Sequence, residues 1–403
     1  MKKTRINTVP IPIPVGIVGF TVNNKALYAT ASYCGILCLN PPTIYFSFEN
    51  ASETLSHILK NGFFSLNIPS VDLFKKISLH KKNMYSLEGL DDFEHFHDTD
   101  SLSPLLKDAP LNLSCKVTQT LAINQTTVII GEILNTYVRE SCLIEGTRNP
   151  HLNAIDPVVA FSDTSFWAAG ACIAKAFSIG NCYGNGPAGA CRHFFKSFAK
   201  SSALKILGAL TFSKKILSGE KTSGNMNSTI GPRALMYPLP TVLLGAEVEN
   251  KPNYSTIGNC GILSLNPMTM YVSSVRQHYT NKGIHKNKAF SINIPGPGII
   301  QQTDYCGLVS GARRDKTKIF HSFYGENSSA PMIEECPVNI ACTLTNTITI
   351  NAMEVCIGTV QAVYLDDMCL HKGLPDIKKI NPVLYSLDRT YWTIGEPITT
   401  PLA

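Results

Sequence analysis

The sequence predicts a mainly β protein with short helices, built from two tandem β-barrel domains. The first observation behind this prediction is an internal repeat. Residues 12–69 align with residues 238–295 without a gap, and 27 of the 58 positions are identical. The second is that each copy consists mostly of short β-branched and aromatic runs bounded by Asn, Pro and Gly, with few helical segments. That pattern is typical of closed or nearly closed barrels.

Length and composition are consistent with this fold class. A chain of 403 residues suits two or three domains, and its 44% apolar residues are enough for sizeable cores. The charged fraction of 16% is too low for a disordered chain. No stretch is long and apolar enough to span a membrane. Thirteen cysteines, an odd number, favour reduced thiols over a disulfide framework, and we therefore expect a cytoplasmic protein.

Two further blocks extend the repeat over most of the chain. Residues 110–142 recur at 337–369, and residues 156–170 recur at 381–395. The last block places the only two tryptophans, Trp167 and Trp392, at equivalent positions. The sequence therefore predicts one domain over 1–170, a linker over 171–231 and a second domain over 232–403.

Each predicted domain contains the same order of elements. The start of the chain, basic and then apolar, has the pattern of a short signal peptide, but it aligns with the internal stretch 238–245 and is therefore expected to be a strand. Between the third strand and the fourth we expect a helix, at 52–62 in copy one and 278–288 in copy two.

The linker differs in composition from both copies. Residues 171–236 contain nine Lys or Arg and one acid, and they open with a Gly- and Cys-rich run at 180–191. Helical spacing follows, which predicts a connecting helix packed on the barrels. The other interpretation is a basic amphipathic helix that binds a membrane surface or an acidic partner. No nucleic-acid-binding module is recognisable, so nucleic acid is not an expected partner.

Copy two carries the candidate chemistry. Arg276 precedes Thr280 at the predicted start of a helix, and a helix N-terminus with a nearby guanidinium is an anion site. Ser310 and Gly311 form a predicted turn followed by Lys316, which suits a phosphate. Asn253, Thr256 and Asn259 lie near a strand end, where polar groups can meet the edge of a heterocycle. Each feature alone also has an ordinary structural role as a helix cap, a surface turn or a strand end.

On these residues, and on the FSINIP and YWTIGE motifs at 290–295 and 391–396, copy two resembles the flavin-reductase-like, FMN-binding split-barrel family. Within it, copy two looks most like flavoredoxins, over nearly all of 236–397. The resemblance implies FMN bound non-covalently at a subunit interface. It implies that Asn253, Thr256 and Asn259 lie by the isoalloxazine, that Arg276, Thr280, Ser310, Gly311 and Lys316 serve the phosphate or the pyrimidine side, and that Tyr391 also contributes. Flavoredoxin-like proteins often have an aromatic residue where this chain has Asn259.

Copy one keeps the scaffold and loses most of these residues. Thr30 and Thr54 match Thr256 and Thr280, but the following residues replace the others: Leu27 for Asn253, Tyr33 for Asn259 and Asn50 for Arg276. No Ser-Gly turn is present, although Lys81 and Lys82 lie in the corresponding region. We expect copy one to be a degenerate packing partner, so that the chain forms an intramolecular pseudo-dimer, or a homodimer, with one FMN per chain. The alternative is that Tyr33 stacks on a ring in a second, differently built site.

The expected function is therefore an FMN-dependent oxidoreductase that transfers electrons or hydride. It would act as a flavin reductase using NAD(P)H, or as a flavoredoxin-like carrier that exchanges electrons with a redox partner protein. We expect no catalytic acid or base and no metal, because Cys172, Cys182 and Cys191 match no standard ligand spacing, and the EHFH run at 94–97 is expected to be a surface loop. The alternative function is a non-catalytic scaffold with decayed flavin sites that acts through its basic linker.

Overall fold

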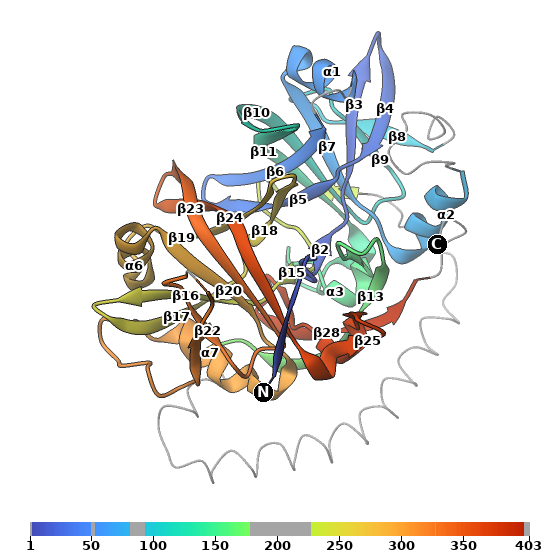
Figure 1. Ribbon diagram of the computed structural model, residues 1–403. Coiled ribbons are helices and arrows are strands. Elements are labelled where there is room, and N and C mark those ends of the chain that lie inside the picture. Colours follow the sequence, from blue (N-terminus) through green and yellow to red (C-terminus); the bar gives the residue numbers. More distant parts are fainter. Residues whose placement is uncertain (1, 50–52, 81–92, 178–226, 327, 399–403) are drawn as a thin grey trace, which may run out of the picture.

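Two eight-stranded antiparallel sheets, one per copy, make up most of the protein (Figure 1). The computed structural model describes residues 2–49, 53–80, 93–177, 227–326 and 328–398. In copy one the main strands run in the order β4-β3-β7-β10-β11-β6-β5, and in copy two β17-β16-β20-β23-β24-β19-β18. Position by position these orders are the same, which confirms the duplication and the predicted mainly β fold of two split barrels.

The strand bounds follow the repeat. Copy one contains β3 (Ile17–Val22), β4 (Lys25–Thr30), β5 (Tyr33–Leu39), β6 (Pro42–Glu49), β7 (Phe63–Ile68), β10 (Leu111–Ile123) and β11 (Thr126–Arg139). Copy two contains β16 (Val242–Val248), β17 (Lys251–Ile257), β18 (Cys260–Leu265), β19 (Met268–Val275), β20 (Ala289–Ile294), β23 (Val338–Ile350) and β24 (Met353–Asp366). Asn23 and Asn24 turn the β3–β4 hairpin with positive φ angles of 48° and 64°, a conformation that asparagine tolerates well.

Helices lie at the ends of the sheets. The predicted helices are α1 (Glu53–Asn61) and α6 (Tyr279–Asn287). Each lies between the fourth and fifth strands of its main sheet, rather than between the third and fourth, because the first hairpin contributes two strands. The next strand is followed by α2 (Val71–His80) in copy one and, after the short η2 (Pro297–Ile299), by α7 (Ile300–Leu308) in copy two.

A third, six-stranded sheet joins the copies. It contains β15 (Leu239–Pro240), β27 (Leu384–Ser386), β28 (Thr390–Pro397), β13 (Phe166–Lys175), β12 (Val158–Ala160) and β2 (Ile13–Pro14), in that spatial order. At its centre Trp167 pairs with Pro397 and Cys172 pairs with Trp392, as a two-fold axis between β13 and β28 requires. A Cβ at Gly170 would lie 2.2 Å from the Ile394 carbonyl oxygen, so glycine allows the two backbones to meet.

Each copy also lends a short arm to the other. β1 (Lys3–Ile6) pairs with β24 of copy two, and β14 (Asn227–Thr229) pairs with β11 of copy one. The Thr4 hydroxyl donates to Asp367 Oδ1 at 2.6 Å. The ends of the expected linker are therefore strands, because β13 continues to Lys175 and β14 begins at Asn227. The predicted basic helix and the other two linker cysteines lie outside the described residues.

The barrels pack through a buried pair of tyrosines. The rings of Tyr45 and Tyr271 meet edge to face with centroids 4.9 Å apart. Tyr45 donates to the Ile262 carbonyl at 2.8 Å, and Tyr271 donates to the Ile36 carbonyl at 3.0 Å, so each copy binds the backbone of the other. Because both buried hydroxyl groups have hydrogen-bond partners, the interface resembles the core of a domain.

The remaining short elements lie outside the three large sheets. They are the hairpins β8 (His95–His97) with β9 (Pro104–Leu106), β21 (Ser322–Tyr324) with β22 (Pro331–Ile333) and β25 (Leu370–His371) with β26 (Leu374–Pro375), the helices α3 (Leu152–Ile155) and α8 (Ile377–Ile380), and the 3₁₀ turns η1 (Glu140–Cys142) and η3 (Asp367–Cys369). The EHFH run is thus an exposed strand rather than a loop.

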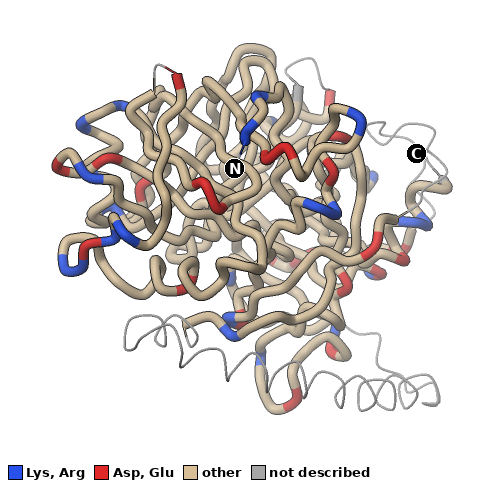
Figure 2. Tube along the Cα trace, turned by 60° about the horizontal axis from the view of Figure 1, so that its bottom comes forward, with Lys and Arg blue, Asp and Glu red and all other residues tan. Residues whose placement is uncertain are grey.

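Charges and thiols outside the linker form no single cluster. Basic and acidic segments are interspersed along the trace in Figure 2, and the chain outside 171–236 has a net charge near −2. The described cysteines other than Cys172 are free and buried, and Cys172 is exposed. Within the described ranges, no three His, Cys, Asp or Glu side chains are grouped as a metal site would need, and no helix has the length and apolar character needed to cross a membrane.

Candidate functional site

The N-terminus of α6 is held against strand β17. Thr280, in the first turn of α6, is buried, and Asn253 Nδ2 on β17 donates to its hydroxyl oxygen at 2.8 Å. The N-cap residue His278 makes no side-chain cap bond, so its own side chain leaves the helix start open to an external anion. Arg276, two positions earlier, is exposed, while its backbone N–H donates to the Ala352 carbonyl at 2.9 Å.

The turn at 310–316 packs against the same helix start. The Ser310 carbonyl accepts from Arg313 N and Arg314 N, both at 3.0 Å, which closes the turn. A Cβ at Gly311 would lie 2.0 Å from Asn253 Oδ1 and 2.9 Å from Tyr279 Cδ1. Only glycine allows this approach, and it places the turn's backbone beside β17 and α6.

Lys316 lies beneath this turn and is almost fully buried, with 3% of its surface exposed. Its ammonium donates to the Tyr254 carbonyl at 2.7 Å and to the Cys306 carbonyl at 3.0 Å, which ties β17 to α7. Burial lowers the pKa of Lys316. An ammonium has three N–H donors, so one remains beyond these two bonds. Desolvation and the nearby charge of Lys316 lower the pKa of His278.

Helix α7 connects two more predicted residues. The Thr256 hydroxyl donates to the Thr303 carbonyl. The Tyr391 hydroxyl on β28 donates to Asp304 Oδ1 at 3.1 Å, and burial, with the Asp304 charge, raises the pKa of Tyr391. Asp304 also accepts from the backbone N–H of Phe177 at 2.7 Å, directly after β13 of copy one. Both copies therefore contribute to this end of the site.

A polar network centred on the buried Glu354 anchors α6 from behind. Glu354 Oε2 on β24 lies 2.9 Å from His285 Nε2 and accepts from Asn281 Nδ2 at 3.1 Å. The Ser274 hydroxyl donates to Asn281 Oδ1 at 3.0 Å. These four residues were not among the predicted site residues. The available signal was that copy one has apolar or uncharged residues at all four equivalent positions.

Taken together, the structure brings Asn253, Thr280 and Gly311 into contact, with Lys316 buried and bonded to the Tyr254 carbonyl of β17. Thr256 and Tyr391 reach the adjacent α7. Asn259 lies just after β17, half-buried, and its carbonyl accepts from Ser273 N at 2.8 Å. Arg276 and Ser310 are exposed at the two edges of the site.

Comparison with known proteins gives the family. The sequence model described as "Flavin reductase like domain" matches residues 9–150 and 234–392. The chain belongs to the flavin reductase-like family. Membership links it to flavin-dependent redox chemistry, and the two matched segments correspond to the two copies.

Individual relatives align with less than half of this flavin reductase-like chain. Flavoredoxin from Methanosarcina acetivorans is 40% identical over 41% of this chain and 90% of its own, with a TM-score of 0.40. Flavoredoxin of Desulfovibrio vulgaris (Miyazaki F) is 32% identical over 44% of this chain and 98% of its own, with a TM-score of 0.42. An uncharacterized protein from Archaeoglobus fulgidus is 27% identical over 144 residues, which is 35% of this chain and 80% of the relative.

The first flavin reductase-like copy has different contacts at the equivalent site. Leu27 and Tyr33 are partly buried and pack against the apolar core, Tyr33 also touching the cluster around Tyr45 and Tyr271. Thr54 is buried in α1 as Thr280 is in α6. Asn50, Lys81 and Lys82 lie outside the described residues. The possibility that Tyr33 stacks on a second ring stays a prediction.

Proposed function

We propose that the protein is an FMN-dependent oxidoreductase whose FMN is held by copy two, between β17, the N-terminus of α6 and the turn at 310–316. The contact of Gly311 with Asn253, beside a helix start that its N-cap side chain leaves open, is the observation that carries this proposal. It brings the turn at Gly311 beside the first turn of α6, whose leading N–H groups have no partner within the helix, and Arg276 is exposed two positions before the N-cap. That donor set fits the phosphate of FMN.

The residues then divide into two groups. Arg276, Thr280, Ser310 and Gly311 would hold the phosphate end, and Asn253, Thr256 and Asn259 would lie along the ring. Lys316 would position β17 through its two carbonyl bonds and direct its remaining N–H toward the cofactor. When bound, FMN supplies the electron or hydride transfer itself. The chain's contribution is to bind the cofactor, orient it and exclude water from one of its faces.

Copy one would act as the packing partner in an intramolecular pseudo-dimer. Phe177 and strand β13 reach Asp304 and Tyr391, which supports a role for copy one in covering the ring end of the site. One FMN per chain follows from this arrangement.

Flavin content and one matched pair of variants test the proposal. The purified protein is incubated with excess FMN, and bound flavin per chain and the Kd for FMN are measured. Arg276→Asn introduces the residue of copy one, and Arg148→Asn, on an exposed position of copy one, makes the same charge change. Loss of a charge-assisted hydrogen bond of about 1.5–3 kcal/mol weakens FMN binding by roughly 10- to 150-fold.

The Arg148→Asn variant should keep the wild-type Kd. No bound flavin in the wild type, or equal effects of the two substitutions, would contradict the proposed site. Two flavins per chain would show that copy one also binds the cofactor.

The electron donor is the second part of the proposal. We propose that NADH or NADPH reduces the bound flavin directly, which anaerobic addition of each nucleotide tests through the loss of visible absorbance. Reduction only by a reduced partner protein would instead favour a flavoredoxin-like carrier.

A further inference from the structure

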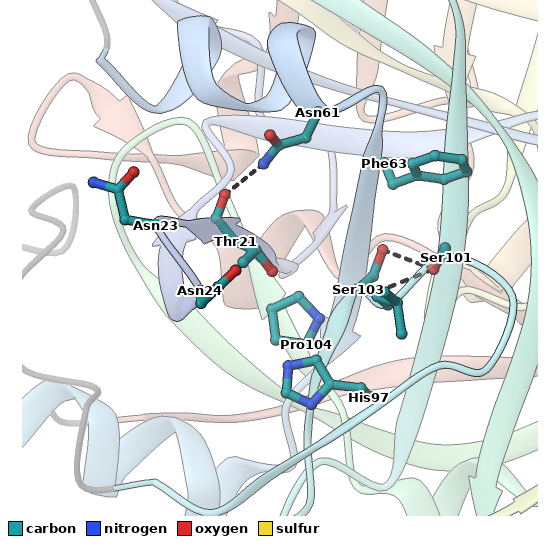
Figure 3. A pocket seen from close by; sticks show the side chains of 10 residues that line it. Thr21, Asn23, Asn24, Asn61, Phe63, His97, Ser101, Ser103 and Pro104 are labelled. Atoms are coloured by element: carbon teal, nitrogen blue, oxygen red, sulfur yellow. Dashed lines mark hydrogen bonds between the residues drawn. The ribbon is translucent and has the colours of Figure 1, made fainter.

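Copy one contains a pocket that shares no residue with the site proposed in copy two. It lies between the β3–β4 turn, the end of α1 and the β8–β9 hairpin, and it has a volume of about 520 Å³ (Figure 3). Sites for small molecules typically have 300–1,000 Å³. Its size therefore suits a molecule as large as a disaccharide.

The lining combines uncharged polar side chains with the apolar Phe63, Leu102 and Pro104. Amide side chains come from Asn23, Asn24 and Asn61, and hydroxyls come from Thr21 and Ser101. The residues lining the pocket include no Lys, Arg, Asp or Glu. Desolvation and the neighbouring His95 lower the pKa of His97, which favours its neutral imidazole. This lining neither attracts an anion nor neutralises a cation.

The wall holds its polar groups in fixed positions. Asn61 Nδ2 at the end of α1 donates to the Thr21 carbonyl, which leaves its side-chain oxygen for other donors (Figure 3). The Ser101 hydroxyl is 2.8 Å from that of Ser103 and 2.7 Å from that of Ser114. The β8–β9 hairpin is secured by Asp98, a fully buried residue whose carboxylate accepts from Tyr137 at 2.7 Å. An apolar surface is supplied by Phe63 and Pro104.

Copy two closes the equivalent place with two larger side chains. Glu247 stands where copy one has Thr21, and Tyr324 stands where copy one has His97. The Tyr324 hydroxyl donates to Glu247 Oε2 at 3.2 Å across the gap. Asn287 Nδ2 donates to the Glu247 carbonyl at 2.8 Å, as Asn61 does to Thr21 in copy one. The backbone is thus shared, and the pocket arises from the shorter side chains of copy one.

From this geometry we infer that copy one binds a neutral polyhydroxylated molecule of mono- to disaccharide size. Amides and hydroxyls offer both donors and acceptors, as vicinal hydroxyl groups require. The Phe63 ring and Pro104 provide the apolar surface on which the C–H face of a sugar ring packs. This site is independent of the flavin site proposed for copy two.

Ligand-observed saturation-transfer NMR on the full chain tests the inference. The probes are D-ribose and maltose, with glucose 6-phosphate and glucosamine as charged comparators. We expect a saturable signal from at least one neutral sugar and a signal at least five-fold weaker from both charged probes. Absence of any signal from ribose and maltose, or stronger binding of a charged probe, would overturn the proposal.

Two variants locate the binding. Asn23→Gly with Asn24→Gly removes two amides and keeps the positive φ angles of the turn. Thr21→Glu with His97→Tyr introduces the closing pair of copy two. Both should reduce the sugar signal at least five-fold. The matched control is Glu249→Gly with Asn250→Gly, at the equivalent turn of copy two, where φ is 53° and 61°.

The control should bind the sugar as the wild type does. Thermal unfolding of each variant confirms that it is folded, and the glycine pair keeps the inference testable if the filled pocket does not fold. Unchanged binding in both copy-one variants would assign the sugar to another place and refute the inference.

Discussion

Copy two supports α6 with a polar network, whereas copy one supports α1 with apolar side chains. Glu354, His285, Asn281 and Ser274 in copy two are replaced by Thr127, Leu59, Leu55 and Phe48, of which Leu55 and Phe48 are buried. Both helices lie at the same place between equivalent strands. The difference shows that the backbone of this barrel does not depend on the chemistry under the helix, so one copy can lose polar residues and still pack.

At the first hairpin it is copy two whose side chains interact across the space that is open in copy one. There copy two is closed by Tyr324 and Glu247, and copy one is open. The two copies therefore differ at the first hairpin as well as beneath the helix. Variants that exchange or disturb equivalent residues measure how far the copies are independent.

The largest effect is expected where the copies share backbone. A methyl group at residue 170 would lie 2.2 Å from the Ile394 carbonyl oxygen and would force β13 away from β28. Gly170→Ala should lower the free energy of unfolding by about 3 kcal/mol, as overpacking against fixed backbone does. Urea unfolding of the variant and the wild type measures this difference in the free energy of unfolding. Gly298→Ala is the control, since nothing lies within 4 Å of a Cβ there, and similar losses in both variants would contradict the interpretation.

A moderate, pH-dependent effect is expected at Tyr391, where copy one has Phe166. Tyr391→Phe removes the bond to Asp304 and should lower the free energy of unfolding by about 1 kcal/mol at pH 8. The raised pKa of Tyr391 keeps its phenol protonated in the folded protein while the unfolded phenol ionises near pH 10.

The wild type therefore loses stability above pH 10 through this group, and the variant does not. The gap between them should narrow between pH 8 and pH 11 in urea unfolding at each pH. A gap that stays constant or widens would contradict the assignment of the raised pKa to this residue.

The smallest effect distinguishes two equivalent serines at the interface. Ser273 donates to the Leu37 carbonyl at 2.5 Å, whereas the buried Ser47 hydroxyl has no hydrogen-bond partner within the described structure. Ser273→Ala should cost about 1 kcal/mol in the free energy of unfolding, and Ser47→Ala should cost nothing or stabilise. Equal costs in thermal and urea unfolding would show that the interface is more symmetric in solution.

Local patterns predicted much of this structure, and tertiary contacts, both within and between the copies, account for what they missed. The repeat and the β-branched runs indicated the strands, and the spacing around Thr280 indicated the helix α6. The six-stranded sheet is not visible in the sequence, because pairing between β13 and β28 joins segments more than 200 residues apart. Lys316 illustrates the limit at the site, since no pattern shows that its ammonium is bonded to two carbonyls. The copy-one pocket exists because copy one lacks the Glu247 and Tyr324 side chains of copy two, and only the comparison of the two copies shows this.

The exchanged arms bear on the order in which this chain can assemble during synthesis. Thr4 and its partner Asp367 are 363 positions apart, and copy one receives β14 only after residue 229 has been made. Copy one therefore leaves the ribosome before β11 can pair with β14, and β1 cannot pair until β24 has been made. Such long-range pairing is slow and exposes edges that aggregate. If the two halves were expressed separately, β24 would lose its pairing with β1 and β11 would lose its pairing with β14. The two copies are therefore expected to unfold as one cooperative unit.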